Sequence, residues 1–285
     1  MRCRLHITSI VAALVLAGVA VPARADGFAE KGRDIFKKHQ HAVVTVQEVL
    51  KVSSGGTSRA NETKQDLTGT VLDPSGLTVL ALSACDPSEM VQRMMGEEYA
   101  RRVDTEISDM RILLDDGTEV PAEIVLRDKD LDLAFIRPKT KPTSPMACVD
   151  LTKTSPAQVL DEVVTLNRLN SAAGRAYAAS VERISAVIQK PRTFYIPDST
   201  MTSTSLGSPA FAQDGNLVGV VVMRTISSRG GASTRNYRDS MASIILPAED
   251  IAKAAKQAPE AKGDSEKKDT ATGTNAAPKD AAEVK

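Results

Sequence analysis

Tryptophan is absent from this sequence, and aromatic residues make up only 3% of its 285 residues. Hydrophobic residues nevertheless reach 42%, which is enough for a globular body with a sizeable core. That core must therefore be filled mainly by Val, Ile, Leu, Ala and Met. A chain of this length fits one or two domains.

Neither sign of charge is in excess, because 36 Lys and Arg residues balance 36 Asp and Glu residues. A nucleic-acid-binding domain favours a basic face, and nothing in the overall composition indicates such a partner. A balanced total still leaves room for a local basic patch. The sequence predicts no cofactor and no metal site.

Long apolar runs are also missing, apart from a mostly apolar stretch at residues 7–21. It is shorter than the roughly 20 residues that a membrane-spanning helix needs. Arg2 and Arg4 precede it, and Ala23-Arg24-Ala25 forms a small-x-small cleavage site. We interpret residues 1–25 as a signal peptide cleaved after Ala25, with a membrane anchor as the alternative. This predicts an exported protein, periplasmic or extracellular, with no transmembrane segment in the mature chain.

Cysteine is scarce, with three residues in all. Cys3 would leave with the signal peptide, so Cys85 and Cys148 remain as an even pair in an oxidising compartment. They either form a disulfide or stay as two buried free thiols, because spacing does not determine pairing.

The remaining sequence predicts a short N-terminal helix within residues 26–40 and then many short strands separated by turns. Asp115-Asp116-Gly117 and Gln213-Asp214-Gly215-Asn216 are hairpin turn signals. Residues 53–63 are polar and predict a loop, whereas residues 87–102 predict a helical insertion. Closely spaced short strands indicate an all-β sandwich or a pair of barrels. Strands are expected at residues 42–46, 68–72, 77–82, 110–114, 122–126, 133–136, 162–166, 178–188, 217–223 and 240–246.

The last part of the chain changes character. Pro247-Ala248-Glu249-Asp250 begins a helix that runs to about Gln257, with acidic residues in its first turn. Residues 258–285 contain no Leu, Ile or aromatic residue and predict a disordered tail.

Three segments, in order, resemble the trypsin-like serine protease domain of the HtrA type. GTVLDPSGLTVLALSACD, residues 69–86, is similar to the family's strand, DxxG turn and strand that ends in the catalytic histidine. DGTEVPAEIVLRDKDLDLAFI, residues 116–136, is similar to the segment with the catalytic aspartate. TSLGSPAFAQDGNLVGVVV, residues 204–222, is similar to the segment with the nucleophilic serine.

The resemblance covers residues 40–257. It implies two packed six-stranded β-barrels, the first over residues 41–145 and the second over residues 146–257 with the terminal helix. In the family, the active cleft lies between the barrels. No second, PDZ-type peptide-binding domain is expected, because the sequence passes directly from the terminal helix into the tail.

The resemblance also implies that the catalytic triad is degenerate. The histidine position falls on Ser83, or on Ala84 with a slip of one residue, and the aspartate position falls on Asp132. The nucleophile position falls on Leu206, and the glycine that helps form the oxyanion hole is replaced by Thr204. A serine hydroxyl needs a base that titrates near neutral pH, which is the range of histidine. Here both partners are lost.

No other histidine is expected to rebuild the triad. His6 lies in the signal peptide, and His39 and His41 lie at the entry to the first barrel, away from the family's cleft. Ser205 and Ser208 flank Leu206, but they are interpreted as ordinary turn residues. Asp132 is interpreted as a carboxylate that satisfies backbone donors.

The leading hypothesis is a non-catalytic pseudoprotease that binds an unidentified extended peptide or protein in or near the former active cleft. Adding a peptide to a strand edge uses main-chain hydrogen bonds and needs no triad. The resemblance suggests the last strand for this contact. An endopeptidase with an atypical active site and a structural envelope domain are the alternatives. The predicted peptide-binding residues are Met241, Ala242, Ser243 and Ile244.

Overall fold

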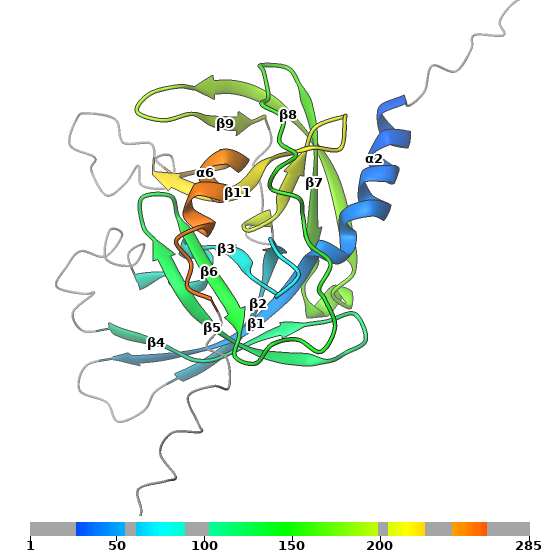
Figure 1. Ribbon diagram of the computed structural model, residues 1–285. Coiled ribbons are helices and arrows are strands. Elements are labelled where there is room, and N and C mark those ends of the chain that lie inside the picture. Colours follow the sequence, from blue (N-terminus) through cyan, green and yellow to red (C-terminus); the bar gives the residue numbers. More distant parts are fainter. Residues whose placement is uncertain (1–26, 55–60, 89–102, 199–204, 226–240, 261–285) are drawn as a thin grey trace, which may run out of the picture.

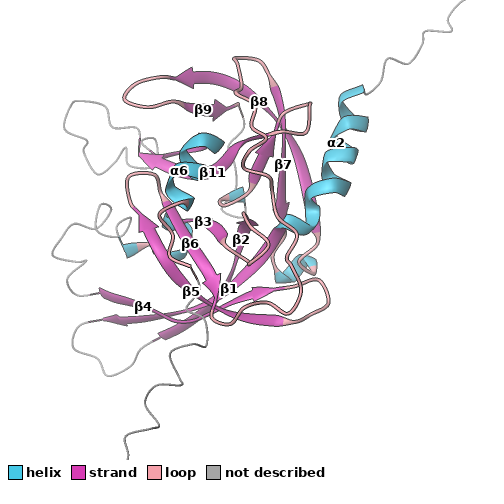
Figure 2. Cartoon of the chain, viewed as in Figure 1, coloured by secondary structure: helices cyan, strands magenta, loops and turns pink. Residues whose placement is uncertain are grey.

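The computed structural model describes residues 27–54, 61–88, 103–198, 205–225 and 241–260. These residues form two closed antiparallel barrels of six strands each, with short helices at the two ends of the described chain. Figure 1 shows one barrel above the other, and Figure 2 shows how strongly strands predominate. The prediction of two six-stranded barrels is confirmed. None of the described helices is long and apolar enough to cross a membrane.

The chain enters the fold through α2, Gly27–His39, which lies along the outside of the second barrel next to β7 (Figure 1). The short 3-10 helix η1, Gln40–Ala42, then leads into the first barrel. The strand order of this barrel is β1-β2-β3-β6-β5-β4. The strands are β1 Val43–Ser54, β2 Asn61–Val71, β3 Thr78–Ala81, β4 Val103–Leu113, β5 Glu119–Asp128 and β6 Leu133–Pro138, with α3, Leu82–Cys85, after β3.

The second barrel has the strand order β10-β11-β12-β9-β8-β7 and is followed by α6, Ala248–Ala255. The 3-10 helix η2, Ser171–Ala173, lies between its first two strands. The strands are β7 Glu162–Arg168, β8 Tyr177–Ile188, β9 Phe194–Pro197, β10 Pro209–Phe211, β11 Leu217–Thr225 and β12 Met241–Pro247.

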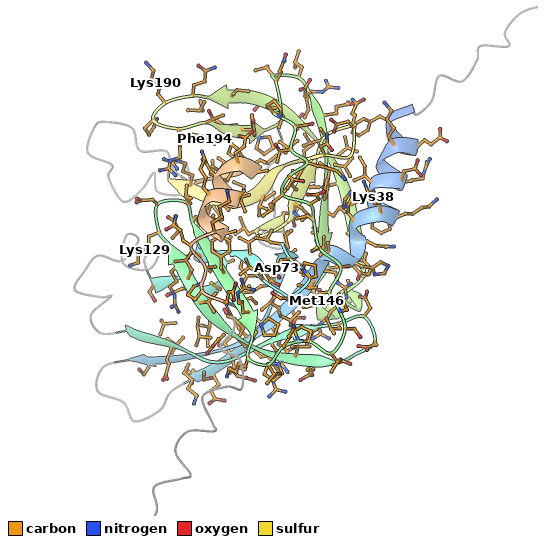
Figure 3. All side chains as sticks on the ribbon, viewed as in Figure 1. Lys38, Asp73, Lys129, Met146, Lys190 and Phe194 are labelled. Atoms are coloured by element: carbon orange, nitrogen blue, oxygen red, sulfur yellow. The ribbon has the colours of Figure 1, made fainter. Side chains whose placement is uncertain are left out.

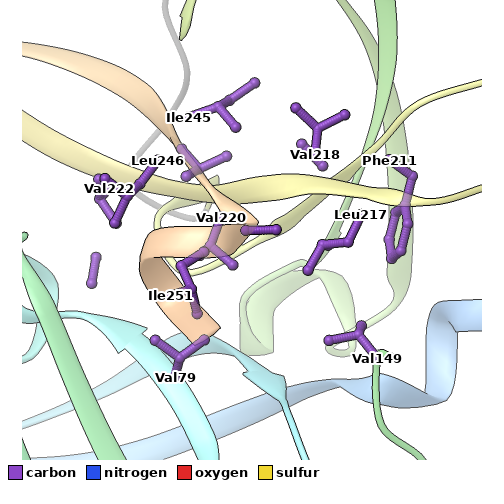
Figure 4. Close-up of a cluster of buried hydrophobic side chains, with 14 of the residues drawn as sticks. Val79, Val149, Phe211, Leu217, Val218, Val220, Val222, Ile245, Leu246 and Ile251 are labelled. Carbon is purple, nitrogen blue, oxygen red and sulfur yellow. The ribbon is translucent and has the colours of Figure 1, made fainter. Parts of the chain in front are cut away.

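Two apolar clusters hold these barrels together. One fills the first barrel with side chains such as Val46, Leu80 and Ile112. The other fills the second barrel and continues across the junction into the first. Figure 4 shows Val79 of β3 and Ile251 of α6 among the side chains of β11. Because aliphatic residues dominate both clusters, the scarcity of aromatic residues does not prevent a continuous core.

The polar stretch predicted as a loop at residues 53–63 is partly strand. β1 extends to Ser54, and β2 begins at Asn61, which pairs with Val52. The first residues of β2 are exposed and polar, so this hairpin is held by main-chain ladder bonds rather than by apolar burial. Most of the predicted helical insertion lies outside the described residues, as do the signal peptide and residues 261–285 of the predicted tail.

The beginning of the predicted tail belongs to the fold. Arg137 of β6 is only 7% exposed, and its Nε donates to the carbonyl of Pro259 at 2.7 Å. Its Nη1 donates to Asp73 and Ser75, at 3.2 and 2.8 Å. Asp73 is labelled in Figure 3, at the turn after β2. The chain therefore returns from α6 to the first barrel.

Candidate functional site

Asp132 immediately precedes β6 and joins the two barrels. Its carboxylate accepts hydrogen bonds from the backbone N–H and the hydroxyl of Ser83, at 2.7 and 2.8 Å. It also accepts from the backbone N–H of Met223 on β11, at 2.8 Å. Its own carbonyl accepts from the N–H of Leu82, and its φ is +58°, a conformation that Asp tolerates better than most residues. These are the contacts expected of a carboxylate that satisfies backbone donors.

The segment resembling the histidine-bearing loop forms α3. Ser83 is half-buried and directed to Asp132, while Ala84 offers its carbonyl to Gln65 Nε2 at 3.2 Å. Neither a serine hydroxyl nor an alanine side chain can take up a proton near neutral pH. Ser83, whose hydroxyl contacts the Asp132 carboxylate, is therefore not suited to act as a general base.

Leu206 lies in the turn before β10, and its side chain is 5% exposed within the larger apolar cluster. The next residue, Gly207, has a φ of +88°, and a Cβ there would lie 2.1 Å from the carbonyl oxygen of Thr68. Gly207 also donates to Val221 at 2.8 Å and accepts from the Thr70 hydroxyl at 2.7 Å. This turn is thereby fixed to β2 and β11, and it holds a leucine inside the protein.

The serines beside Leu206 differ in accessibility. Ser208 is fully buried, and its Oγ has no hydrogen-bond partner among the described residues. Ser205 is half-buried. A nucleophile must reach its substrate, so the burial of Ser208 argues against that role. Thr204, predicted at the oxyanion-hole position, lies outside the described residues.

The two histidines among the described residues, His39 and His41, bond or stack elsewhere. His41 is exposed, and its Nδ1 lies 2.7 Å from Asp115 Oδ2 and 3.3 Å from the Tyr177 hydroxyl. His39 is buried, with its ring stacked on that of Phe211 at 4.4 Å between centroids. Burial and the nearby Lys38 charge lower the pKa of His39, so a neutral ring is favoured there. Both histidines help attach the N-terminal segment to the body.

The predicted peptide-binding residues form the first part of β12. Met241, Ala242, Ser243 and Ile244 pair with Thr225, Arg224, Met223 and Val222 of β11. On its other edge β12 is paired with β9 at Ile245 and Tyr195. Any added peptide strand would therefore have to use the edge of residues 241–244 that faces away from β11.

Cys85 and Cys148 are free thiols in the structure. Cys85 is fully buried in the first barrel, and Cys148 is half-buried against the same apolar cluster. Burial raises the pKa of both thiols, and nearby carboxylates raise it further. Neither is therefore poised as a thiolate nucleophile. In the described part of the chain, no three His, Cys, Asp or Glu side chains are grouped so that they could hold a metal ion.

Glu48 was not singled out from the sequence, although its partner Gln65 also donates to Ala84 of α3. It is 0% exposed, and Gln65 donates one amide hydrogen bond to its Oε1, while Oε2 has no partner among the described residues. Burial raises its pKa to about 8. Strand alternation was the available signal, because Glu48 shares the inward face of β1 with Val46 and Leu50.

Comparison with known proteins identifies a family that this chain matches. The family described as trypsin-like peptidase domain matches residues 38–220. One similar solved structure is the MamO protease domain from Magnetospirillum magneticum in its apo form, with 16% identity and a TM-score of 0.49. That match covers 76% of this chain and 97% of the other. No curated protein matches the chain.

Proposed function

The chain belongs to the family of trypsin-like peptidase domains, and we propose that it is an exported member without peptidase activity, which binds an extended peptide or protein segment near the junction of its barrels. The burial of Leu206 is the observation that carries the non-catalytic part of this proposal. Where the resemblance puts a nucleophile, an apolar side chain packs into the core.

The general base is missing as well. Asp132 would orient a histidine in an active relative, but here it accepts from the Ser83 hydroxyl and from the backbone N–H groups of Ser83 and Met223. Triad members act as a unit, so the loss of two of them removes most of the rate enhancement that the triad gives. A rearranged enzyme would need a nucleophile and a base elsewhere. The burial of Ser208 and the contacts of His39 and His41 argue against this alternative.

Peptide binding is proposed for the last strand. Residues Met241 to Ile244 are bonded along one edge to β11, and a peptide strand would add main-chain bonds along the other. Such binding needs a fixed backbone edge and no reacting side chain. It would therefore survive the loss of the triad.

Export is proposed from the N-terminal sequence. Cleavage after Ala25 would leave every described element intact, because α2 begins at Gly27. Western blotting of cell fractions for the mature and the precursor sizes tests this part. A full-length product retained in the cytoplasm would contradict it.

A serine-directed fluorophosphonate tests the absence of activity. Intact mass after incubation should be unchanged, whereas active trypsin labelled in parallel gains one adduct. Stoichiometric labelling that is lost in Ser205→Ala or Ser208→Ala would overturn the non-catalytic proposal.

Hydrogen exchange tests the binding strand. With a pool of extended nine-residue peptides present, amide exchange at residues 241–244 should slow. Exchange at Val163 and Val164 of β7, which are paired within the second barrel, should not change. Unchanged exchange at every site would favour a structural envelope domain instead.

A further inference from the structure

A polar cavity of about 440 Å³ lies at the junction of the barrels, away from Asp132 and Leu206. Its walls come from β1 and β2 of the first barrel and from the loop between β7 and β8 of the second. This volume falls within the range of small-ligand sites. The lining residues are Gln47, Lys64, Asp66, Asn170, Ser171, Ala172 and Arg175.

Hydrogen bonds within the protein fix one wall of this cavity. Arg175 donates from Nε and Nη2 to Asp66, at 2.9 and 3.3 Å, and Gln47 Nε2 donates to the same carboxylate at 3.1 Å. Gln47 is 7% exposed, and the Asp66 side chain is 10% exposed. The guanidinium is therefore held in one orientation, which lowers the entropy cost of using it to bind a ligand.

The charge of the lining is not balanced. Asp66 is paired with Arg175, whereas Lys64 forms no ion pair with any described residue and lies exposed at the cavity. Nη1 of Arg175 likewise donates no hydrogen bond within the described part of the chain. Two cations and one carboxylate leave a formal charge of +1, which matches a monoanion rather than a doubly charged phosphate.

We propose that this cavity binds a carboxylate side chain of an extended peptide lying along the junction of the barrels. The peptide part of this inference rests on the proposed function. Lys64 and the free Nη1 of Arg175 would donate to the carboxylate, with the hydroxyl of Ser171 as a neutral donor at the rim.

The outer face of β2 separates the cavity from Leu206. Thr70 contacts Gly207, next to Leu206, Thr68 contacts Arg168, and Asp66 is the next residue on the same face. Thr68 and Thr70 are only 3% and 0% exposed, so a peptide cannot lie over them. It would reach Asp66 and Arg175 from the exposed side of the cavity, where Lys64 lies.

Fluorescence polarisation with two matched pools tests this site. Each pool holds fluorescein-labelled nine-residue peptides with Ala, Ser, Val or Leu at eight positions and either Glu or Gln at the ninth. The full chain should bind the Glu pool about fivefold more tightly, the size of a partly exposed ion pair. Lys64→Gln should abolish the difference, Lys64→Arg should retain it, and the control Lys141→Gln, an exposed lysine outside the cavity, should leave it unchanged.

The outcomes separate this inference from the proposed function. Equal binding of both pools by every variant would overturn the carboxylate site and leave peptide binding intact. If neither pool binds, the peptide proposal fails, and NMR titration with sodium acetate decides the cavity. Amide shifts of Lys64 and Arg175 that are lost in Lys64→Gln would support the site, whereas no shifts would overturn it.

Discussion

At the scale of single residues, Glu48 makes stability depend on pH. Its pKa rises from 4.5 to about 8 on folding, so the folded protein keeps a proton that the unfolded chain loses above pH 4.5. Stability is therefore full below that pH and falls until the folded carboxyl also ionises near pH 8. Each unit between the two pKa values is worth about 1.4 kcal/mol, so the loss at neutral pH is on the order of 3 kcal/mol.

We predict that Glu48→Gln removes this dependence. The amide retains an oxygen to accept from Gln65 and has no charge to desolvate. Urea unfolding between pH 5 and 8 should show the wild type losing stability relative to the variant as the pH rises, because the contribution of His39 is common to both. Glu123→Gln, at an exposed position of β5, should follow the wild type. If Glu48→Gln keeps the wild-type change of unfolding free energy with pH, another group causes that change.

Leu206 gives a second residue-scale prediction. Restoring triad side chains with Ser83→His and Leu206→Ser should not restore activity, because a buried leucine is replaced by a small polar group in a turn fixed by Gly207. Removing a buried leucine side chain costs roughly 2–5 kcal/mol. Casein hydrolysis should stay at background, and thermal unfolding should show the loss of stability. Leu206→Met should be well tolerated, and a folded, active double variant would contradict the prediction.

At the scale of elements, the residues that follow α6 bond to the first barrel. Truncation after Glu260 should leave the thermal midpoint nearly unchanged, whereas truncation after Gln257 removes the Pro259 carbonyl that accepts from buried Arg137. Leaving that donor unpaired should cost roughly 1–3 kcal/mol. Differential scanning calorimetry of the two truncations measures the contrast. Equal midpoints would mean that water or another acceptor replaces Pro259.

The strands show how far the sequence determines the fold. Alternation and turn signals predict most of them, including the hairpin at Gly117, where φ is +82° and a short turn joins β4 to β5. The polar start of β2 was missed because its exposed residues show no apolar alternation, and only their main-chain pairing with the neighbouring β1 makes them a strand. β9 and β10, with only four and three residues, offer too little periodicity to be recognised.

The candidate site, too, could be predicted only in part from the sequence. The resemblance pointed to Ser83 and Asp132, and the structure joins them by two hydrogen bonds. Met223 and Thr70 could not be expected there, because their contacts arise only when one barrel packs on the other. The same holds for Arg175 and Asp66, which lie 109 residues apart. Local patterns reveal a strand face, but they do not show what faces it across a domain junction.

At the scale of the whole molecule, Asp115 links three parts of the chain. Located in the β4–β5 turn, it accepts from Arg168 Nη1 at 3.1 Å and from the Tyr177 hydroxyl, both in the second barrel, and pairs with His41. Burial would raise the pKa of Asp115, but these hydrogen bonds together lower it. The Arg168 side chain is 10% exposed and stacks over the Tyr177 ring at 3.8 Å. Asp115 in the β4–β5 turn of the first barrel thus pairs with the nearly buried guanidinium of Arg168 in the second barrel.

We predict that Asp115→Ala weakens the attachment of the barrels and of the N-terminal segment. The change leaves the Arg168 guanidinium without its carboxylate, and losing a hydrogen bond to a charged group costs roughly 1.5–3 kcal/mol. Urea unfolding should show a lower free energy, and amides near His41 should exchange faster. Asp116→Ala is the matched control, because Asp116 bonds only within the turn, to Thr118, in the described chain. If both variants lose the same stability, the turn itself rather than the contact between barrels explains the effect.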